Sequence, residues 1–350
     1  MVGYGETSGG AIVRELRASG HEVLVTPTRA CATKNEHIHA TYRDLAERDL
    51  RGVDCLFMYN THHQFAAEIR RMLYERGLTG IVLAGYTHGS HWDPSDQIRA
   101  NFPLLRFADL GNVMAMDTVF LVSQYMADTM ADTIGRELGL RVRAEFLQKA
   151  RVVGGTIDNQ RLDAARVAED AGVTIVFNHS ASPAKRPAVF FLAAREVLAA
   201  RPDTRVLVTR RFAPSAPGGP ELYDLRRRYP DRIVLGDTMP TDDYFAWLWR
   251  SQIQVSTAFH ESFGVSTVES IYAGCCSLLP PRGCYREITG EAGLYDERRL
   301  ATVLLEHAAD PAARRRVAVQ QREAIQRYLP ARVARRIADA LAEARERLRA

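Results

Sequence analysis

The sequence predicts an α/β protein with two doubly wound, Rossmann-like domains that face a cleft. Short apolar runs alternate with segments of helical periodicity in both halves of the chain, which is the rhythm of strand–helix–strand units in a parallel sheet. A length of 350 residues is large for one core and ordinary for two domains. The composition, 46% hydrophobic and 25% charged, is that of a folded chain without extended disorder.

The first half of the chain contains the strands of one sheet. A glycine-rich loop, residues 3–10, leads into a predicted helix over 11–19. The expected strands are 20–26, 53–59, 81–84, 119–123 and 151–158, and the expected helix after the fourth strand is 124–134. Only Met1 and Val2 precede the loop, so we expect the usual first strand to be very short or to be lost through a misassigned start.

The second half repeats this rhythm. The expected strands are 173–177, 204–208, 232–235, 253–256 and 276–279, and the expected helices are 187–200, 221–229, 242–250 and 265–273. The tail over 311–350 is rich in Ala and Arg and helical, with a break at Pro330; a coiled coil or a nucleic-acid-binding tail is the other interpretation. We expect an N-terminal domain over 1–155, a C-terminal domain over 156–330 and a final helix over 331–350.

Charge and cysteine content narrow the class of protein. The net charge of +4 is a modest basic excess, which suits phosphorylated ligands and does not oppose nucleic acid. The five cysteines are odd in number and have no zinc-ligand spacing, so we expect no disulfide framework and a reducing, cytoplasmic location. No stretch of 18 apolar residues and no leader pattern is present, so no integral membrane segment is expected, and peripheral attachment remains compatible with the sequence.

Two glutamates, Glu261 and Glu269, lie eight residues apart around a Phe-Gly turn and form the most informative motif of the chain. A predicted strand precedes the turn and a predicted helix follows it. This order places Glu261 at the mouth of a parallel sheet and leaves the amides of Phe263, Gly264 and Val265 free to face a ligand. An anion is favoured at such a helix start. The other interpretation is a pair of surface glutamates on an amphipathic helix.

This motif resembles the Glu-x7-Glu signature of the retaining, GT-B-fold glycosyltransferases of the family 4 type. The similarity continues through 272–275, 278–280 and 285–288 and covers roughly the C-terminal half of the chain. In that family the first Glu holds sugar hydroxyls, the second holds the nucleotide ribose, and the turn amides meet the sugar and the diphosphate. The resemblance therefore implies that Glu261, Glu269 and residues 263–265 bind the donor, and that the final helix crosses back to an N-terminal acceptor domain.

A cation for the departing diphosphate is expected in the loop after the strand 173–177. Lys185 lies there, and the family typically has an Arg ahead of this Lys. The equivalent place is Ser180, which leaves Arg186, Arg210 or Arg211 as substitutes. The chain has no Asp-x-Asp, the metal-binding signature of the GT-A fold, so we expect metal-independent chemistry. The other interpretation of Lys185 is an ordinary surface charge at a helix start.

The N-terminal half offers weaker candidates. The glycine-rich loop matches neither Gly-x-x-x-x-Gly-Lys-Ser/Thr nor Gly-x-Gly-x-x-Gly. The resemblance implies that Gly9 and Gly10 lie under the donor diphosphate and near the acceptor. It also implies that His88, at the end of the strand 81–84, faces the transferring sugar, with His91 as the alternative. Ordinary loop histidines are an equally good interpretation, and a zinc site would lack ligands beyond Asp93.

Together with the resemblance, these residues imply a retaining transfer of a hexose from a GDP- or UDP-sugar to an acceptor hydroxyl or amine. Glu261 would lie beside the positive charge that develops on the sugar ring, while Lys185 and the helix start would neutralise the diphosphate. His88 would contact the sugar. No cofactor is expected besides the nucleotide-sugar co-substrate. Because no residue is an obvious covalent nucleophile, we expect a same-face displacement in which the leaving phosphate receives the acceptor proton.

Four interpretations of the function are compatible with the sequence. The C-terminal half, including Asn178, His179 and Lys185, is most similar to the tRNA-queuosine mannosyltransferase branch, which would imply GDP-mannose and tRNA. A small-molecule acceptor is comparably compatible, because the N-terminal half resembles that branch much less. A nucleotide-sugar epimerase or hydrolase, or a non-catalytic relative suggested by Ser180, would use the same fold.

Overall fold

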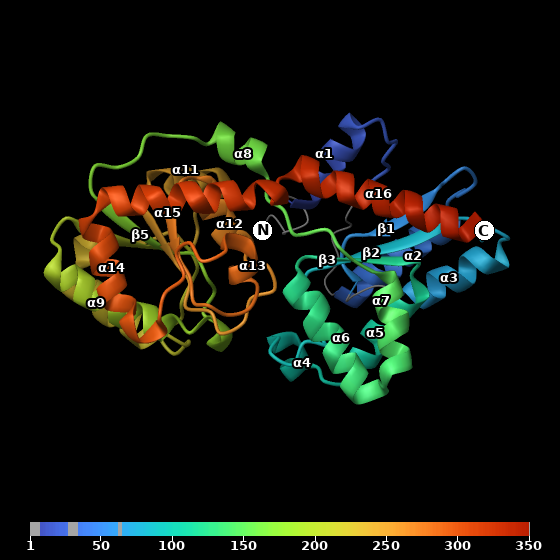
Figure 1. Ribbon diagram of the computed structural model, residues 1–350, viewed down its shortest axis with the longest axis horizontal. Coiled ribbons are helices and arrows are strands. Elements are labelled where there is room, and N and C mark those ends of the chain that lie inside the picture. Colours follow the sequence, from blue (N-terminus) through green and yellow to red (C-terminus); the bar gives the residue numbers. More distant parts are fainter. Residues whose placement is uncertain (1–7, 27–33, 62–64, 350) are drawn as a thin grey trace. The chain divides into compact units, whose positions relative to one another are not determined.

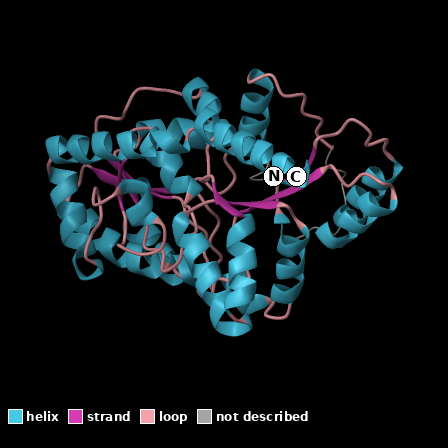
Figure 2. Cartoon of the chain, turned by 45° about the vertical axis from the view of Figure 1, so that its right-hand side comes forward, coloured by secondary structure: helices cyan, strands magenta, loops and turns pink. Residues whose placement is uncertain are grey.

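The computed structural model describes residues 8–26, 34–61 and 65–349. The described residues form two compact units. The N-terminal unit contains the residues up to Gly155 together with the final segment from Pro330, and the C-terminal unit is Thr156–Leu329. In both units helices pack around the strands of a sheet (Figure 2).

The N-terminal unit contains a parallel sheet in the order β1-β2-β3-β4 (Figure 1). Its strands are β1 (Cys55–Met58), β2 (Val82–Thr87), β3 (Thr118–Leu121) and β4 (Ala150–Val152). Its helices are α1 (Gly10–Ala18), α2 (Lys34–Glu47), α3 (Ala66–Glu75), α4 (Gln97–Asn101), α5 (Leu105–Ala115), α6 (Gln124–Leu138), α7 (Leu140–Lys149) and α16 (Pro330–Arg349). Every residue of β2 and β3 is buried, as expected for inner strands of a parallel sheet covered by helices.

The C-terminal unit contains a second parallel sheet in the order β7-β6-β5-β8-β9. Its strands are β5 (Val173–Phe177), β6 (Thr204–Val208), β7 (Ile233–Leu235), β8 (Ile253–Val255) and β9 (Cys276–Leu278). Its helices are α8 (Asn159–Ala164), α9 (Pro187–Ala200), α10 (Gly219–Arg228), α11 (Thr241–Arg250), α12 (Val265–Tyr272), α13 (Tyr285–Thr289), α14 (Leu300–Ala309) and α15 (Pro311–Ala324). The strand order reverses between β5 and β8, and ligands of open α/β sheets bind beyond the carboxyl ends of strands at such a point.

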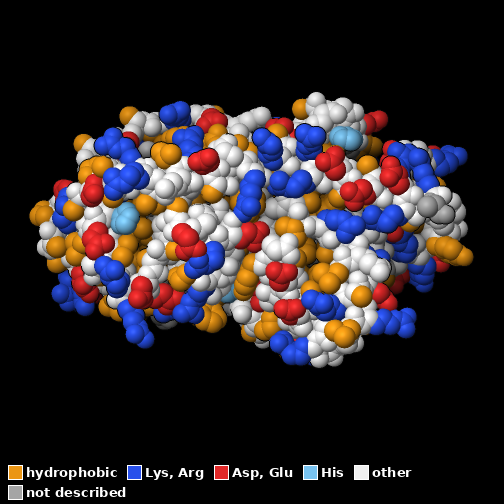
Figure 3. All heavy atoms as spheres, in the orientation of Figure 1, with side chains coloured by type: hydrophobic (Ala, Val, Ile, Leu, Met, Phe, Trp, Pro, Cys, Tyr) orange, Lys and Arg blue, Asp and Glu red, His pale blue; other side chains and the backbone are white. Residues whose placement is uncertain are grey.

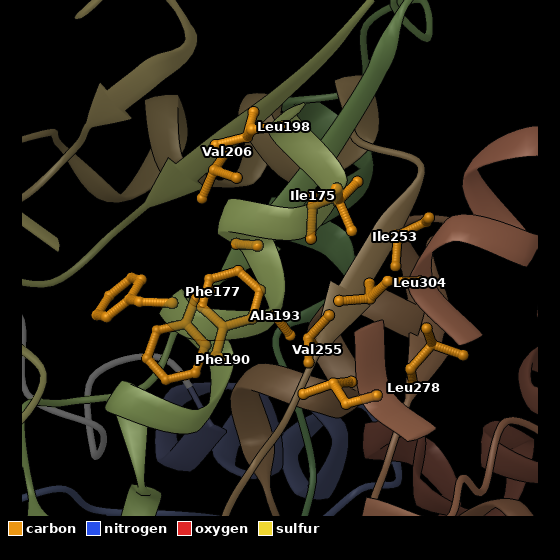
Figure 4. Packing of buried hydrophobic residues seen from close by; sticks show 14 of the residues in the cluster. Ile175, Phe177, Phe190, Ala193, Leu198, Val206, Ile253, Val255, Leu278 and Leu304 are labelled. Carbon is orange, nitrogen blue, oxygen red and sulfur yellow. The ribbon is translucent and has the colours of Figure 1, made fainter. Parts of the chain in front are cut away.

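Aromatic packing fixes α9 against this sheet (Figure 4). Phe177 of β5 stacks on Phe190 of α9 with ring centroids 4.7 Å apart and an interplanar angle of 9°. Val255 of β8 and Leu278 of β9 extend the same buried cluster. The loops that leave β5 and β8 therefore start from well-packed strands.

The final helix α16 belongs to the N-terminal unit. Its buried face, formed by Val333, Ala334, Ile337, Ala340 and Ala344, packs against α1, β2 and β3. Arg336 donates a hydrogen bond to the carbonyl of Val153 over 2.7 Å. The chain therefore returns to its first unit, as predicted, and the apolar stripe that a coiled coil would need is used inside that unit. Acidic and basic side chains are interspersed along the helix (Figure 3).

The predicted strand over 20–26 is wrong. Residues 21–26 have no regular secondary structure, and Leu24 and Val25 are 74% and 58% exposed. An apolar run becomes a strand only where a neighbouring strand hydrogen-bonds with it, and no pairing in the described sheets includes these residues. The guanidinium of Arg17 instead donates to the carbonyl of Val23 over 2.6 Å.

The predicted strand over 151–158 is shorter than expected. It is β4, which ends at Val152, because Gly154 has a φ of +86° that turns the chain out of the extended conformation. The remaining strands, and the helices around the candidate site, lie within a few residues of their predicted bounds. The first residues of the glycine-rich loop, and Met1 and Val2 before them, lie outside the described residues.

Candidate functional site

The predicted turn between β8 and α12 is confirmed and requires a glycine. Gly264 has a φ of +76° and immediately precedes α12. A Cβ at this position would lie 3.2 Å from Cγ of Glu261, so a side chain would meet both backbone strain and a crowded neighbour. The first amides of α12 have no partner within the helix, and the turn that precedes them lies against Glu261.

Glu261 and Lys185 form an ion pair in the C-terminal unit. The Nζ atom of Lys185 lies 2.7 Å from Oε2 of Glu261, and the two side chains are 20% and 17% exposed, with Lys185 the more exposed. Nζ also donates to the carbonyl of His260 over 3.2 Å. Two residues that different motifs predicted are thus in direct contact.

Backbone contacts hold the two loops together around this pair. The hydroxyl of Thr257 donates to the carbonyl of Lys185 over 2.7 Å, and the amide of Phe259 donates to the carbonyl of Ala184 over 2.7 Å. The loop after β9 also packs closely against Glu261, because a Cβ on Gly283 would lie only 2.7 Å from the carbonyl oxygen of Glu261. These contacts therefore fix the backbone that carries the Glu261 carboxylate and the Lys185 ammonium.

Glu261 is ionised at neutral pH. Burial by itself would raise the pKa of this carboxyl, but the adjacent Lys185 ammonium and the neighbouring His179 and His260 outweigh burial and leave the pKa below its usual value. A fixed negative charge at this place can stabilise positive charge that develops on a bound molecule.

Glu269 behaves differently, although it lies on the same motif. It is 8% exposed, and the hydroxyl of Tyr244 donates to its Oε2 over 3.0 Å. Burial raises the pKa of Glu269 to about 7, although the Tyr244 hydrogen bond and the positive charge of Arg210 act in the opposite direction. This carboxyl therefore exchanges its proton near neutral pH.

A polar network links Glu269 to the ends of β5 and β8. The side-chain amide nitrogen of Asn178 lies within hydrogen-bonding distance of Tyr244 Oη (3.1 Å), the Ser266 carbonyl (3.0 Å) and Ser270 Oγ (3.0 Å). Gln254 donates in turn to Oδ1 of Asn178 over 3.2 Å. The network fixes the residue that directly follows β5 against α11 and α12.

The other predicted donor-site residues have distinct environments. The side chain of Phe263 is buried and packs edge-on against the ring of Tyr328, so only its backbone amide remains for a ligand. The side chain of Val265 is partly buried at the start of α12. Arg186 forms an ion pair with Glu297 over 2.6 Å and is already engaged.

Arg210 is the most suitable of the cations suggested as substitutes at Ser180. It follows β6, its side chain is exposed, and its charge acts on Glu269, Tyr244 and His179. No ion pair of Arg210 occurs among the residues that the structure describes. Arg211 is exposed beside it.

The N-terminal unit brings Gly9 and His88 to one tyrosine. Nε2 of His88, directly after β2, lies 3.0 Å from the carbonyl oxygen of Tyr59, and the two rings lie 4.8 Å apart. A Cβ on Gly9 would lie 3.1 Å from the ring of Tyr59, and Gly10 begins α1. The alternative histidine, His91, is buried 3.5 Å from the carboxylate of Asp109.

His179, Tyr244 and Gln254 are members of the site that the sequence motifs do not identify. His179 and Asn178 directly follow a buried strand, which is a signal that sequence reasoning can use. Tyr244 and Gln254 lie inside a helix and a strand, where nothing in the local pattern separates them from structural residues.

Two hollows elsewhere in the C-terminal unit lie at the opposite, amino ends of the strands. One of about 360 Å³ is lined by residues such as Thr204 and Arg205, and one of about 500 Å³ by residues such as Trp249 and Arg322. Within the described ranges, no three His, Cys, Asp or Glu side chains are grouped so as to hold a metal ion, and no helix has the length and apolar character to cross a membrane.

The amino-acid sequence is only distantly similar to that of a known protein. No family model matches the chain. The tRNA-queuosine alpha-mannosyltransferase of Drosophila melanogaster is 20% identical over 212 residues, which are 56% of this chain and 56% of that protein. The chain thus aligns with about half the length of this curated relative.

Solved structures match over most of the chain. The UDP-forming alpha,alpha-trehalose-phosphate synthase from Burkholderia vietnamiensis has a TM-score of 0.65 at 14% identity, covering 89% of this chain and 79% of that one. The N-terminal domain of Candida albicans trehalose-6-phosphate phosphatase has a TM-score of 0.67 at 11% identity, covering 91% and 77%. The fold is GT-B. The predicted α/β class and the GT-B resemblance are therefore confirmed at the level of the fold.

Proposed function

We propose that the protein is a retaining glycosyltransferase that moves a hexose from a GDP- or UDP-sugar to an acceptor hydroxyl or amine. The observation that carries the proposal is the 2.7 Å contact between Lys185 and Glu261 beside the start of α12. It joins a cation and an ionised carboxylate at the point where the strand order reverses. When the bond between a sugar and a diphosphate breaks, positive charge develops on the sugar and negative charge on the diphosphate. A carboxylate and an ammonium within a few ångströms of each other can stabilise both charges.

The donor roles follow from the chemistry of each group. Glu261, ionised and braced, would hold sugar hydroxyls and stabilise the positive charge that develops at the anomeric carbon. Lys185 and the first amides of α12 would receive the negative charge of the departing diphosphate. Glu269 would accept hydrogen bonds from the ribose hydroxyls. Positive charge from these protein groups supports a reaction without a metal ion.

The proposed reaction proceeds on one face of the sugar. The acceptor oxygen or nitrogen forms a bond to the anomeric carbon on the side from which the diphosphate leaves, the bond from that carbon to the phosphate oxygen breaks, and the acceptor proton passes to the leaving phosphate. One structural neighbour, a trehalose-6-phosphate synthase, is described as an enzyme of glycosyl transfer with retention. That neighbour has a TM-score of 0.66 with this chain.

In the N-terminal unit we assign Gly9, Gly10 and His88 to contacts with the substrates. A glycine at position 9 lets the backbone come close to Tyr59, and His88 shares the same tyrosine. A small-molecule acceptor in the cytoplasm is our first candidate. A tRNA acceptor is the second, favoured by the sequence similarity to the Drosophila melanogaster tRNA-queuosine alpha-mannosyltransferase, and its binding would weaken steeply as salt is raised.

A binding screen tests the proposal. The purified protein is titrated with UDP, GDP, ADP, UDP-glucose and GDP-mannose by calorimetry, without divalent metal. We expect saturable binding of one nucleotide and its sugar conjugate. Binding that appears only after Mg²⁺ is added would contradict metal independence, and the absence of any binding would contradict the function.

Product analysis completes the test. With an acceptor, the NMR coupling of the anomeric proton should show the configuration of the donor, and an inverted product would contradict the mechanism. Rapid conversion of the donor alone, without an acceptor, would favour the epimerase or hydrolase alternative.

A further inference from the structure

His179 is an unusual residue within the candidate donor site. It is 3% exposed, and its Nε2 atom is enclosed by protein without a hydrogen-bonding partner among the described residues. A buried polar atom left in this state costs about 1–3 kcal/mol of folding free energy. Natural proteins seldom retain such an atom in the core, and each one that occurs calls for an explanation such as a role in binding or catalysis.

The position of His179 is well determined. Its ring packs edge-on against Phe177, the last residue of β5, with centroids 5.5 Å apart. The preceding residue, Asn178, is held by the hydrogen bonds to Tyr244 and Ser270 described above. The imidazole is therefore a pre-oriented group at the carboxyl end of a central strand.

The charges around the ring are those of the proposed donor site. Burial, together with the positive charges of Lys185 and Arg210, lowers the pKa of His179 to about 4, although Glu261 acts in the opposite direction. The imidazole is therefore neutral at physiological pH. Lys185 and Arg210 already supply positive charge for the diphosphate of the proposed donor, so a neutral ring would add little to its binding. A neutral imidazole can donate or accept a hydrogen bond, which suits a hydroxyl group.

We propose that His179 hydrogen-bonds a hydroxyl group of the donor sugar through Nε2. The inference rests on the proposed function. In this structure Lys185 and Glu261 form an ion pair with each other. A bound diphosphate would take the place of Glu261 beside the Lys185 ammonium, and a bound sugar would take the place of Lys185 beside the Glu261 carboxylate. Separating the pair would move the two charged groups that act on the His179 ring and would bring a sugar hydroxyl to Nε2. His179 thereby selects nucleotide sugar over free nucleotide.

The test compares two affinities in the unaltered protein and in variants at this position. His179→Phe keeps the ring and its contact with Phe177 but removes both nitrogens, and His179→Gln places an amide near the position of Nε2. Calorimetry gives the Kd values for UDP-glucose and UDP, or for GDP-mannose and GDP if the unaltered protein prefers guanine. The thermal midpoint checks the fold, and His179→Leu repeats the test if His179→Phe does not fold.

We expect His179→Phe to weaken binding of the nucleotide sugar about 10-fold or more, to leave binding of the nucleotide within about 2-fold, and to melt no lower than the unaltered protein. His179→Gln should restore most of the sugar affinity. Unchanged sugar binding in His179→Phe would overturn the inference, and so would an equal loss for nucleotide and nucleotide sugar. If the unaltered protein binds no nucleotide, the proposed function itself fails.

Discussion

The two glutamates of the Glu-x7-Glu motif have pKa values that are shifted in opposite directions, although the sequence presents them as a symmetric pair. Glu261 faces an ammonium and stays ionised, while Glu269 faces a phenol and takes up a proton near neutral pH. The difference arises because the Lys185 ammonium outweighs burial at Glu261, whereas at Glu269 burial outweighs the hydrogen bond from Tyr244 and the charge of Arg210.

Substitution should separate the roles of the two glutamates. Glu261→Gln should lower kcat by about 10² to 10³ with a small change in nucleotide affinity, because a charge used in the transition state is lost. Glu269→Gln should raise the nucleotide Kd by about 10-fold, because a ribose-binding carboxylate is lost. Steady-state kinetics and calorimetry measure the two effects. Equal, negligible effects on both quantities would refute the site assignment.

Nucleotide binding should depend on pH through Glu269. Ribose hydroxyls donate to a carboxylate, so we expect the affinity to rise as the pH passes upward through about 7, where this group loses its proton. Tyr244→Phe removes a hydrogen bond that lowers the pKa and should move the midpoint to higher pH. Calorimetric titrations over a span of ~3 pH units around that pKa test both. A flat profile in the unaltered protein would exclude Glu269 as the ribose ligand.

The free energy of unfolding should also depend on the protonation of Glu269, but with the opposite pH trend. The pKa of Glu269 rises from 4.5 to about 7 on folding, so the folded state binds an extra proton between these values. Its contribution is therefore fully present below pH 4.5 and is lost as the pH rises through about 7. Denaturant unfolding at several pH values should show a smaller fall across this window in Glu269→Gln than in the unaltered protein.

At the scale of an element, the turn into α12 is the part on which the donor site depends. Gly264→Ala introduces left-handed strain of about 1–2 kcal/mol and a Cβ that crowds Glu261. We expect a lower thermal midpoint together with a loss of nucleotide-sugar binding of at least about 10-fold.

Gly77→Ala provides a matched control for this substitution. Gly77, at the end of α3, also has a positive φ, of 67°, but a Cβ there would meet nothing within 4 Å. It should lower stability by a similar amount and leave binding unchanged. Equal loss of binding in both variants would show that general destabilisation, and not the turn, causes the effect.

At the scale of the whole molecule, α16 makes the N-terminal unit discontinuous in sequence. Ile337 is fully buried in the face of α16 that packs within this unit. Ile337→Asp should destabilise the N-terminal unit by several kcal/mol, because a buried charge would lack a partner. Hydrogen exchange should accelerate in β1, β2 and β3 and stay unchanged in β5, β6 and β8. Arg332→Ala, at an exposed position of the same helix, is the control. Uniform acceleration in both sheets would contradict this assignment.

Several parts of this protein follow from local chemistry that is visible in its residues. Apolar runs such as 173–177 and 204–208 are strands because both faces of an inner parallel strand are buried, and that requirement is visible in the residues alone. The strand, glycine turn and helix around Glu261 follow from the same local rules. Sequence reasoning failed at residues 20–26, where an apolar run found no partner strand.

The contacts between distant side chains arise from the folded arrangement of the chain. The pairing of Lys185 with Glu261, the hydrogen bond from Tyr244 to Glu269 and the enclosed nitrogen of His179 join segments that lie far apart along the chain. Local propensity carries no information about such contacts, because strand order and loop closure create them. The protonation states follow from the same contacts, since burial and neighbouring charges shift each pKa away from the ordinary value of its residue type.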